Sequence, residues 1–219
     1  MTETDRPGAP DMVWYAGYGS NLCAERFRCY IAGGIPPGLT RPSRGARDTR
    51  LPREDRALDI DHRLYFAGFA RPWGGAPCFI DTVESPGTPT HACAYLITWE
   101  QFEDVVAQEN GRPTAPIDLD RGDLTEKGST RLGPGRYENL LCFGRHDDGF
   151  PVVTITSART MSEARLGAPS PAYLTVLIAG VRQSHSMSDD AIVAYLAAAP
   201  GCSEQLVVSA FAAADDSGA

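Results

Sequence analysis

A short aromatic strand that ends in a glycine loop, residues 13–22, most constrains how this chain can fold. Its sequence is Val-Trp-Tyr-Ala-Gly-Tyr-Gly-Ser-Asn-Leu. Aromatic and β-branched residues favour a strand, and Gly17 and Gly19 permit the positive φ or the close backbone approach of a tight turn. Ser20 or Asn21 is predicted to cap a helix that continues through Phe27.

A strand that turns at glycine into a helix directs several backbone N–H groups at one spot. Such a spot favours an anion, through hydrogen bonds and through the helix dipole. The segment therefore indicates either an anion-binding loop or an ordinary strand–turn–helix connection, since a Gly-x-Gly-Ser string alone is compatible with both.

Length and charge narrow the class of protein. The chain has 219 residues, enough for one sizeable core, and a net charge of −8, which argues against a nucleic-acid surface or an anionic membrane as partner. No apolar run approaches the ~20 residues of a membrane span, and the first ten residues lack the apolar core of a signal peptide. We therefore expect a cytoplasmic protein that binds neither nucleic acid nor membrane, while no pattern predicts its oligomeric state.

The cysteines and histidines give little sign of a metal site. No two of the six cysteines have a C-x-x-C spacing, and the four histidines are scattered without paired spacing, so no metal ligands are predicted. The cysteines are expected to be free thiols, mostly buried. Cys23 follows the glycine loop, where a helix dipole lowers a thiol pKa, so a nucleophilic Cys23 is an alternative.

The remaining pattern predicts one domain over residues 12–201, with a disordered tail at 1–11 and a C-terminal tail at 202–219. Residues 33–61 are expected to form a long irregular excursion, either a solvated surface segment or a cover over a pocket mouth. Glycine and proline turns then separate short strands, typical of a curled sheet or small barrel, at 63–67, 78–83, 91–97, 137–143 and 151–156. Later helices are predicted to start at Ser170-Pro171 and at Ser188.

The helix predicted after Thr98 carries a carboxylate on its apolar face. Thr98 and Gln101 form a capping box, and the apolar face continues to Glu109 at position i+7 from Phe102. Burial of a carboxylate is costly and raises its pKa towards the range in which a general acid/base works. Glu109 is therefore a catalytic candidate, unless the last turn lets it reach solvent. The other acids are expected mainly on the opposite side, namely Glu100, Glu103 and Asp104.

Four motifs together resemble the γ-glutamylcyclotransferase-like family. The first is the N-terminal loop Tyr18-Gly19-Ser20-Asn21-Leu22, and the second is the helix end Gln108-Glu109-Asn110-Gly111, which carries the family's catalytic glutamate. The third is the start of a late helix, Pro169-Ser170-Pro171-Ala172-Tyr173, and the fourth is the glycine turn Trp73-Gly74-Gly75. The resemblance runs from about residue 13 to 199. Two features depart from it: residues 105–108 lack the leucine-aspartate pair of many relatives, and the arginine-rich excursion at 33–61 is foreign to the glutathione-directed enzymes.

This resemblance implies an α+β fold, a small mixed β-barrel surrounded by helices, with a pocket for a γ-glutamyl group. The substrate-binding residues would be those of the loop, Tyr18, Gly19, Ser20, Asn21 and Leu22, whose amides would hold the α-carboxylate. Tyr173 would either bond the substrate or pack in the core. Glu109 would move the proton as the α-amine attacks the γ-carbonyl and 5-oxoproline forms, and this intramolecular reaction requires no metal or cofactor.

Two other classes of function stay open. One is a non-catalytic small-molecule binding protein on the same fold. The other is a hydrolase that uses a metal or Cys23. The sequence does not identify the amine released from a γ-glutamyl substrate.

Overall fold

The structure is a computed structural model that describes residues 11–216. Two sheets are formed by β1 (Met12–Gly17), β2 (Asp55–Ile60), β3 (His62–Phe66), β4 (Cys78–Glu84), β5 (Thr90–Thr98), β6 (Ser129–Arg131), β7 (Asn139–Arg145) and β8 (Pro151–Thr156). The α-helices are α1 (Ala24–Ala32), α2 (Trp99–Glu109), α3 (Arg121–Lys127), α4 (Pro171–His185), α5 (Asp189–Ala197) and α6 (Glu204–Asp216). Apart from Asp11, the tail predicted at 1–11 lies outside the described residues.

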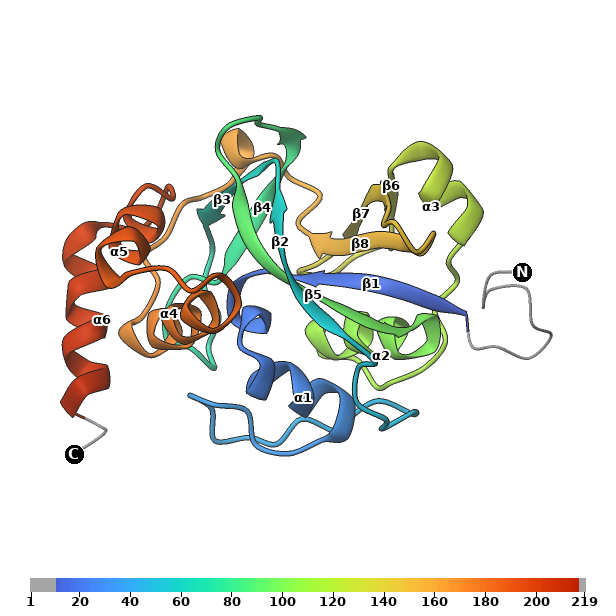
Figure 1. Cartoon of the computed structure of the whole chain (residues 1–219), viewed down its shortest axis with the longest axis horizontal. Coiled ribbons are helices and arrows are strands. Elements are labelled where there is room, and N and C mark those ends of the chain that lie inside the picture. The colour runs from blue at the N-terminus through green and yellow to red at the C-terminus, as the bar shows by residue number, and fades with distance from the viewer. Residues whose placement is uncertain (1–10, 217–219) are drawn as a thin grey trace.

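Strand β1 is the centre of the larger sheet, whose order is β2-β5-β1-β8-β7-β6 (Figure 1). It pairs antiparallel with β5 on one side and parallel with β8 on the other. All six of its residues are buried, as expected for a continuously apolar strand covered on both faces. Helices α1 and α2 lie along one side of this sheet, and α4, α5 and α6 gather at one end (Figure 1).

The α+β class is confirmed, but the sheet is not closed into the predicted barrel. Its end strands, β2 and β6, do not pair with each other in the described chain, and β3 and β4 form a separate two-stranded sheet. The two sheets meet through side chains, as where Thr156 Oγ1 donates to the Ile80 carbonyl at 2.6 Å. Strand β6, the last strand of the larger sheet on that side, has only three residues and directly follows α3.

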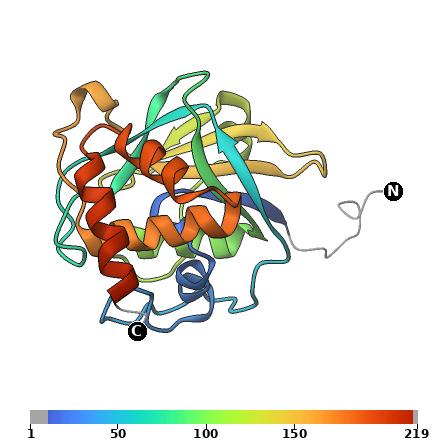
Figure 2. The ribbon, with the colours of Figure 1, turned by 60° about the vertical axis from the view of Figure 1, so that its left-hand side comes forward.

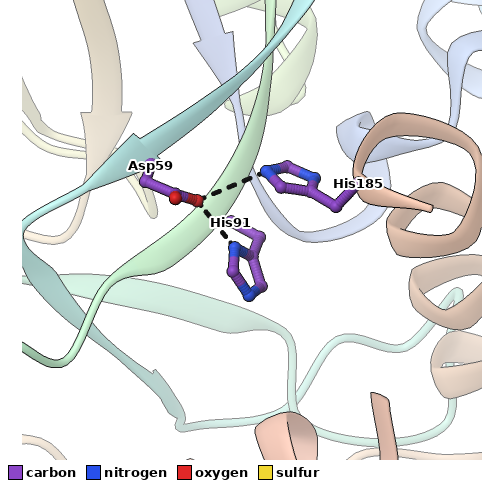
Figure 3. Close-up of side chains that lie close together, drawn as sticks. All are labelled: Asp59, His91 and His185. Carbon is purple, nitrogen blue, oxygen red and sulfur yellow. Dashed lines mark hydrogen bonds and ion pairs between the residues drawn. The ribbon is translucent and has the colours of Figure 1, made fainter. Parts of the chain in front are cut away.

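The excursion predicted at 33–61 is not irregular throughout, because its last residues form β2. This strand pairs along β5 and places Asp59 directly opposite His91 (Figure 3). The sequence also did not predict two helices, α3 and α6. Helix α3 is capped by the side chain of Asp120, and it lies in a stretch that has few apolar residues to mark it.

The C-terminal tail predicted at 202–219 is wrong over Glu204–Asp216, which form α6. Figure 2 shows this helix lying across α4, and it packs against both α4 and α5. Val207 and Ala210 are fully buried there, because they share one face of the helix at i and i+3. Among residues 11–216, no helix is both long enough and apolar enough to cross a membrane.

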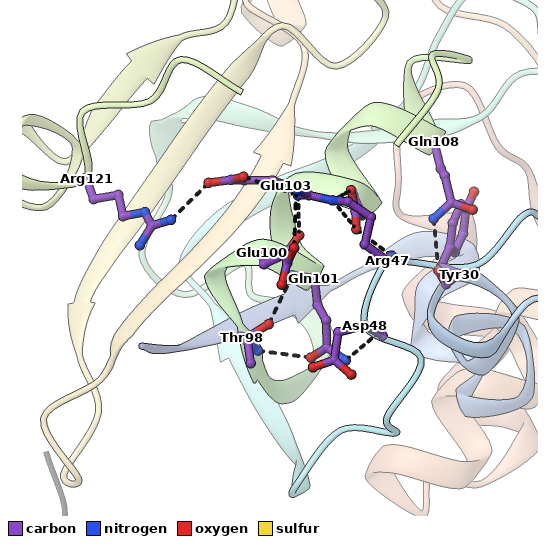
Figure 4. A network of polar contacts seen from close by, with 10 residues as sticks. Tyr30, Arg47, Asp48, Thr98, Glu100, Gln101, Glu103, Gln108 and Arg121 are labelled. Carbon is purple, nitrogen blue, oxygen red and sulfur yellow. Dashed lines mark hydrogen bonds and ion pairs between the residues drawn. The ribbon is translucent and has the colours of Figure 1, made fainter. Parts of the chain in front are cut away.

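The expectation that the other acids of α2 face away from the core is also wrong for Glu103 and Asp104, which are buried. The segment after residue 45 covers this face, and Arg47 Nε donates to Asp104 Oδ1 at 2.9 Å. Arg47 also lies 3.5 Å from Glu103 (Figure 4). Arg121 reaches Glu103 from α3 at 2.9 Å. These ion pairs compensate the buried carboxylates and fix α2, whose last residue is Glu109.

Candidate active site

The glycine loop and the end of α2 meet at a recess beside β1. Its deep part is small and is lined by Tyr15, Tyr18, Ser20, Asn21, Cys78, Glu109, Tyr137, Ile155 and Tyr173. It opens into an outer part of about 490 Å³, which shares Ser20, Glu109, Tyr137 and Tyr173 with it. That size is in the range of small-molecule sites in proteins.

Asn21 connects the loop to Glu109. Its Nδ2 donates to Glu109 Oε1 at 2.8 Å and to the Tyr15 hydroxyl at 2.9 Å. Residues Gly19–Leu22 form a 3₁₀ turn, and the N-cap of α1 is Cys23. The predicted helix cap at Ser20 or Asn21 is therefore wrong, because the Asn21 amide points into the recess and bonds side chains there.

The tight loop requires glycine at position 19. Gly19 has a φ of +63°, and a Cβ placed on it would lie 2.5 Å from Cys78 Sγ and 3.1 Å from the Tyr173 hydroxyl. Tyr173 itself accepts a hydrogen bond from the Cys78 backbone N–H at 3.2 Å. The start of α4 and strand β4 therefore close over the loop so tightly that a methyl group has no room.

Of the other predicted site residues, Tyr18 and Tyr173 line the recess and Leu22 does not. Tyr18 lines the recess, but its hydroxyl donates to the Ile155 carbonyl at 2.8 Å and so holds the loop against β8. Tyr173 both lines the recess and packs against Trp73, with ring centroids 4.9 Å apart. Leu22 is 2% exposed in the core and does not line the recess.

Glu109 is half-buried among tyrosines whose hydroxyls keep their protons. The pKa values of Tyr15, Tyr30 and Tyr137 are raised mainly by burial and, as the second cause, by the negative charge of Glu109. Burial also raises the pKa of the Cys78 thiol to about 12. Of the described residues that line the recess, Glu109 alone carries a carboxylate, so it is the candidate base.

Arg26 is a site residue that the sequence reasoning missed. It is 4% exposed, its guanidinium lies 4.9 Å from the Trp73 ring centroid, and it lines the outer recess. Its Nη2 donates to the Tyr30 hydroxyl at 3.2 Å, whereas its Nε and Nη1 are buried without a hydrogen-bond partner in the described chain. The available signal was an arginine beside Phe27 on the apolar face of α1.

The recess contains both hydrogen-bond acceptors and hydrogen-bond donors that lack a partner in the described chain. Asn21 Oδ1 and Gln108 Oε1 are buried acceptors without a partner among the described residues, and Arg26 supplies unpaired donors and a positive charge. Buried polar groups without partners cost free energy, and a ligand that pairs with them recovers it. An ammonium matches the acceptors and a carboxylate matches the arginine, so the recess is complementary to the α-amino acid end of a molecule.

The first part of the excursion borders the mouth of this recess. Residues 38–44 line a groove of about 840 Å³. The groove shares five residues with the outer recess, namely Tyr30, Leu39, Pro72, Gln108 and Gly111. The groove is basic, with four arginines, Arg41, Arg44, Arg71 and Arg112. An acidic protein therefore presents a positively charged approach to its recess.

The cysteines are free, as predicted, but Cys23 lies apart from this recess. It is buried at the N-cap of α1 and lines neither part of the recess. The cysteine that does line it, Cys78, is held as a protonated thiol by its raised pKa. A nucleophile needs the thiolate, so the geometry favours Glu109 over either cysteine.

Two curated proteins resemble this chain in sequence. It is 35% identical over 199 residues to "Histone deacetylase 5" of Arabidopsis thaliana, across 84% of this chain and 30% of that protein. It is 26% identical over 185 residues to "Gamma-glutamyl cyclotransferase aclK" of Aspergillus oryzae, across 80% of this chain and 58% of that protein. The chain thus spans less than two thirds of either relative. No family model matches it.

Two solved structures resemble its backbone at 15% sequence identity. One is a "Gamma-glutamyl cyclotransferase" and the other is the uncharacterized protein loc79017 from Homo sapiens. Each has a TM-score of 0.46 and is matched over 87% of this chain and 89% of that chain.

Proposed function

We propose that this chain is an enzyme of the γ-glutamylcyclotransferase-like family, which releases 5-oxoproline and a free amine from a γ-glutamyl amine or peptide. The observation that carries the proposal is the Glu109 carboxylate, held by Asn21 in a recess whose unpaired groups match an α-amino acid. The relative named as a γ-glutamyl cyclotransferase supports the same activity.

The substrate binds by its α-amino and α-carboxylate groups. The first N–H groups of the 3₁₀ turn at Gly19–Leu22 have no partner within the turn and hold the α-carboxylate. Arg26 supplies the buried positive charge that balances it. The Asn21 Oδ1 acceptor and the Glu109 carboxylate receive the α-ammonium. Tyr15, whose hydroxyl accepts from Asn21, keeps its own hydrogen for a ligand oxygen.

Glu109 then moves protons from the α-nitrogen to the departing amine. It takes one proton from the α-ammonium, and the freed amine attacks the γ-carbonyl carbon to form the new C–N bond of the five-membered lactam. Glu109 gives that proton to the leaving nitrogen as the original C–N bond breaks. The attacking nitrogen loses a second proton, which leaves the lactam N–H, and this proton converts the released amine to its ammonium form. Both reacting groups belong to one substrate, so holding it in the reactive conformation supplies much of the rate.

The amine that leaves carries acidic groups. It must lie toward the mouth of the recess, because the α-amino acid end fills the part beside Asn21. The mouth continues into the groove with four arginines, which favours a carboxylate or phosphate on the leaving side. The cytoplasmic location and a small-molecule substrate remain predictions from the sequence.

The activity test is a panel of γ-glutamyl compounds incubated with the purified chain. The panel compares neutral and acidic leaving amines, for example γ-glutamyl-alanine and γ-glutamyl-glutamate, with glutathione included, and 5-oxoproline is measured by mass spectrometry. Release is expected, with the acidic leaving amine preferred. Binding without release would favour the non-catalytic alternative, and equal rates for both amines would refute the role of the arginine groove.

Histone deacetylation is not part of the function proposed for this chain. The match covers 30% of the Arabidopsis protein, so the activity in its name belongs to a much longer molecule. A hydrolase that uses Cys23 is also disfavoured, since that residue lines neither part of the recess.

A further inference from the structure

Outside the recess, three side chains converge on one point from three elements of the fold. Asp59 lies on β2, His91 lies opposite it on β5, and His185 is the last residue of α4 (Figure 3). One ligand atom of each lies within 4.8 Å of those of the other two. Only the fold brings these residues together, since they are far apart in the sequence.

Short contacts link the three groups. His91 Nδ1 lies 2.7 Å from Asp59 Oδ1, and His185 Nε2 lies 3.3 Å from the same oxygen. The two imidazole rings have centroids 4.5 Å apart. In tetrahedral zinc sites the bonds of 2.0–2.1 Å separate neighbouring ligand atoms by about 3.3 Å. The His185–Asp59 separation already has this value, and the Asp59 side chain, 58% exposed, can move to lengthen the other.

The hydrogen bonds of Ser184 determine which nitrogen of His185 is available. Ser184 Oγ donates its one hydrogen to the Gly180 carbonyl at 2.8 Å, so at 2.7 Å from His185 Nδ1 it can only accept. With this assignment of the Ser184 hydrogen, the proton of a neutral His185 imidazole is on Nδ1. The Nε2 lone pair then faces the Asp59 carboxylate, and this buried nitrogen has no hydrogen-bond partner in the described part of the chain.

A lone pair and a carboxylate oxygen that face each other repel unless a cation lies between them. The site also lies at the C-terminal end of α4, where the helix dipole favours positive charge.

We propose that Asp59, His91 and His185 bind one divalent transition-metal ion of the Zn²⁺ class, through Oδ1, Nδ1 and Nε2 respectively. Two imidazoles and a carboxylate are the ligands such ions prefer. Ser184 is the outer-shell partner that orients His185, as in many histidine-metal sites. Metal binding at His91 Nδ1 leaves the proton of that ring on Nε2. The ion joins the edge of the sheet to the end of α4.

The test titrates the chelator-treated full chain with ZnCl₂ and, separately, with CoCl₂. We expect one ion per chain by calorimetry, a higher Tm with metal, and cobalt d–d absorption without a thiolate charge-transfer band. His91→Gln and His185→Gln should each lose binding. Ser184→Ala, which removes no metal ligand, should weaken binding roughly 10–100-fold. Circular dichroism checks that each variant is folded.

The matched control is His146, which lies 3.3 Å from Asp148 and so forms a histidine–aspartate pair without the second histidine. His146→Gln should bind Zn²⁺ as the wild type does. Absence of binding in the wild type would show a hydrogen-bonded cluster only and would overturn the proposal. Binding that survives in both His91→Gln and His185→Gln, or a thiolate band, would overturn it as well. None of these measurements depends on turnover.

Discussion

Asn21 and Glu109, which are 88 positions apart, are joined by a hydrogen bond of 2.8 Å between Nδ2 and Oε1. The bond connects the glycine loop to the end of α2. A hydrogen bond to a charged group contributes about 1.5–3 kcal/mol. If it orients the catalytic carboxylate, Asn21→Ala should lower kcat for 5-oxoproline release roughly 10–100-fold. A kcat equal to that of the wild type would show that Glu109 needs no support from the loop.

Arg26 should matter for substrate binding more than for folding. Replacing it with methionine removes a buried cation with two unpaired nitrogen donors, so Tm should stay unchanged or rise. The KM for a γ-glutamyl substrate should rise roughly 10–100-fold, because the carboxylate loses its charged partner. Arg28→Met is the control, since Arg28 is exposed on the same helix. An unchanged KM in Arg26→Met would remove Arg26 from the site.

Alanine substitutions at Gly19, in the loop, and at Gly74, in the turn after Trp73, distinguish backbone strain from steric contact. Both have positive φ, +63° and +67°, but a Cβ on Gly74 would meet nothing within 4 Å. Gly74→Ala should therefore cost only the strain of the left-handed conformation, about 1–2 kcal/mol of unfolding free energy. Gly19→Ala should cost more and should also lower turnover. Equal losses of stability in urea unfolding would contradict the tight packing of the loop against Cys78.

Arg47 should be a major contributor to stability. Asp104, its partner, has a fully buried side chain, and removing one partner of a buried ion pair costs about 3–5 kcal/mol. We expect Arg47→Met to lose stability of this order in chemical denaturation. Arg50→Met is the control, because Arg50 pairs with Asp48 at the surface and its loss should leave the unfolding free energy close to that of the wild type. Similar values for both variants would contradict this role.

Local signals in the sequence were read correctly. The capping box of Thr98 and Gln101 is present, and Ser170 and Ser188 cap α4 and α5 as predicted. Each of these features depends on residues within four positions of one another, which a sequence shows directly. The placement of Glu109 next to the glycine loop also followed from helix periodicity together with the family resemblance.

Features that depend on distant partners were missed. Strand β2 is defined by pairing with β5, and half of its own residues are charged. Arg26 appeared to be an ordinary helix residue, because its burial depends on Trp73 packing over it. The histidine cluster escaped notice for the same reason, since His91 and His185 come from a strand and a helix that only the fold brings together.

The central claim is that Glu109 transfers the proton, and Glu109→Gln tests it most directly. Glutamine keeps an oxygen that accepts from Asn21, so the variant should fold normally and should still bind substrate. Its matched control is Glu25→Gln, an exposed glutamate on α1, whereas Glu103 is unsuitable because it pairs with Arg47 and Arg121. We expect 5-oxoproline release to fall by roughly 100-fold or more in Glu109→Gln and to be unchanged in Glu25→Gln. Full release by folded Glu109→Gln would contradict the account.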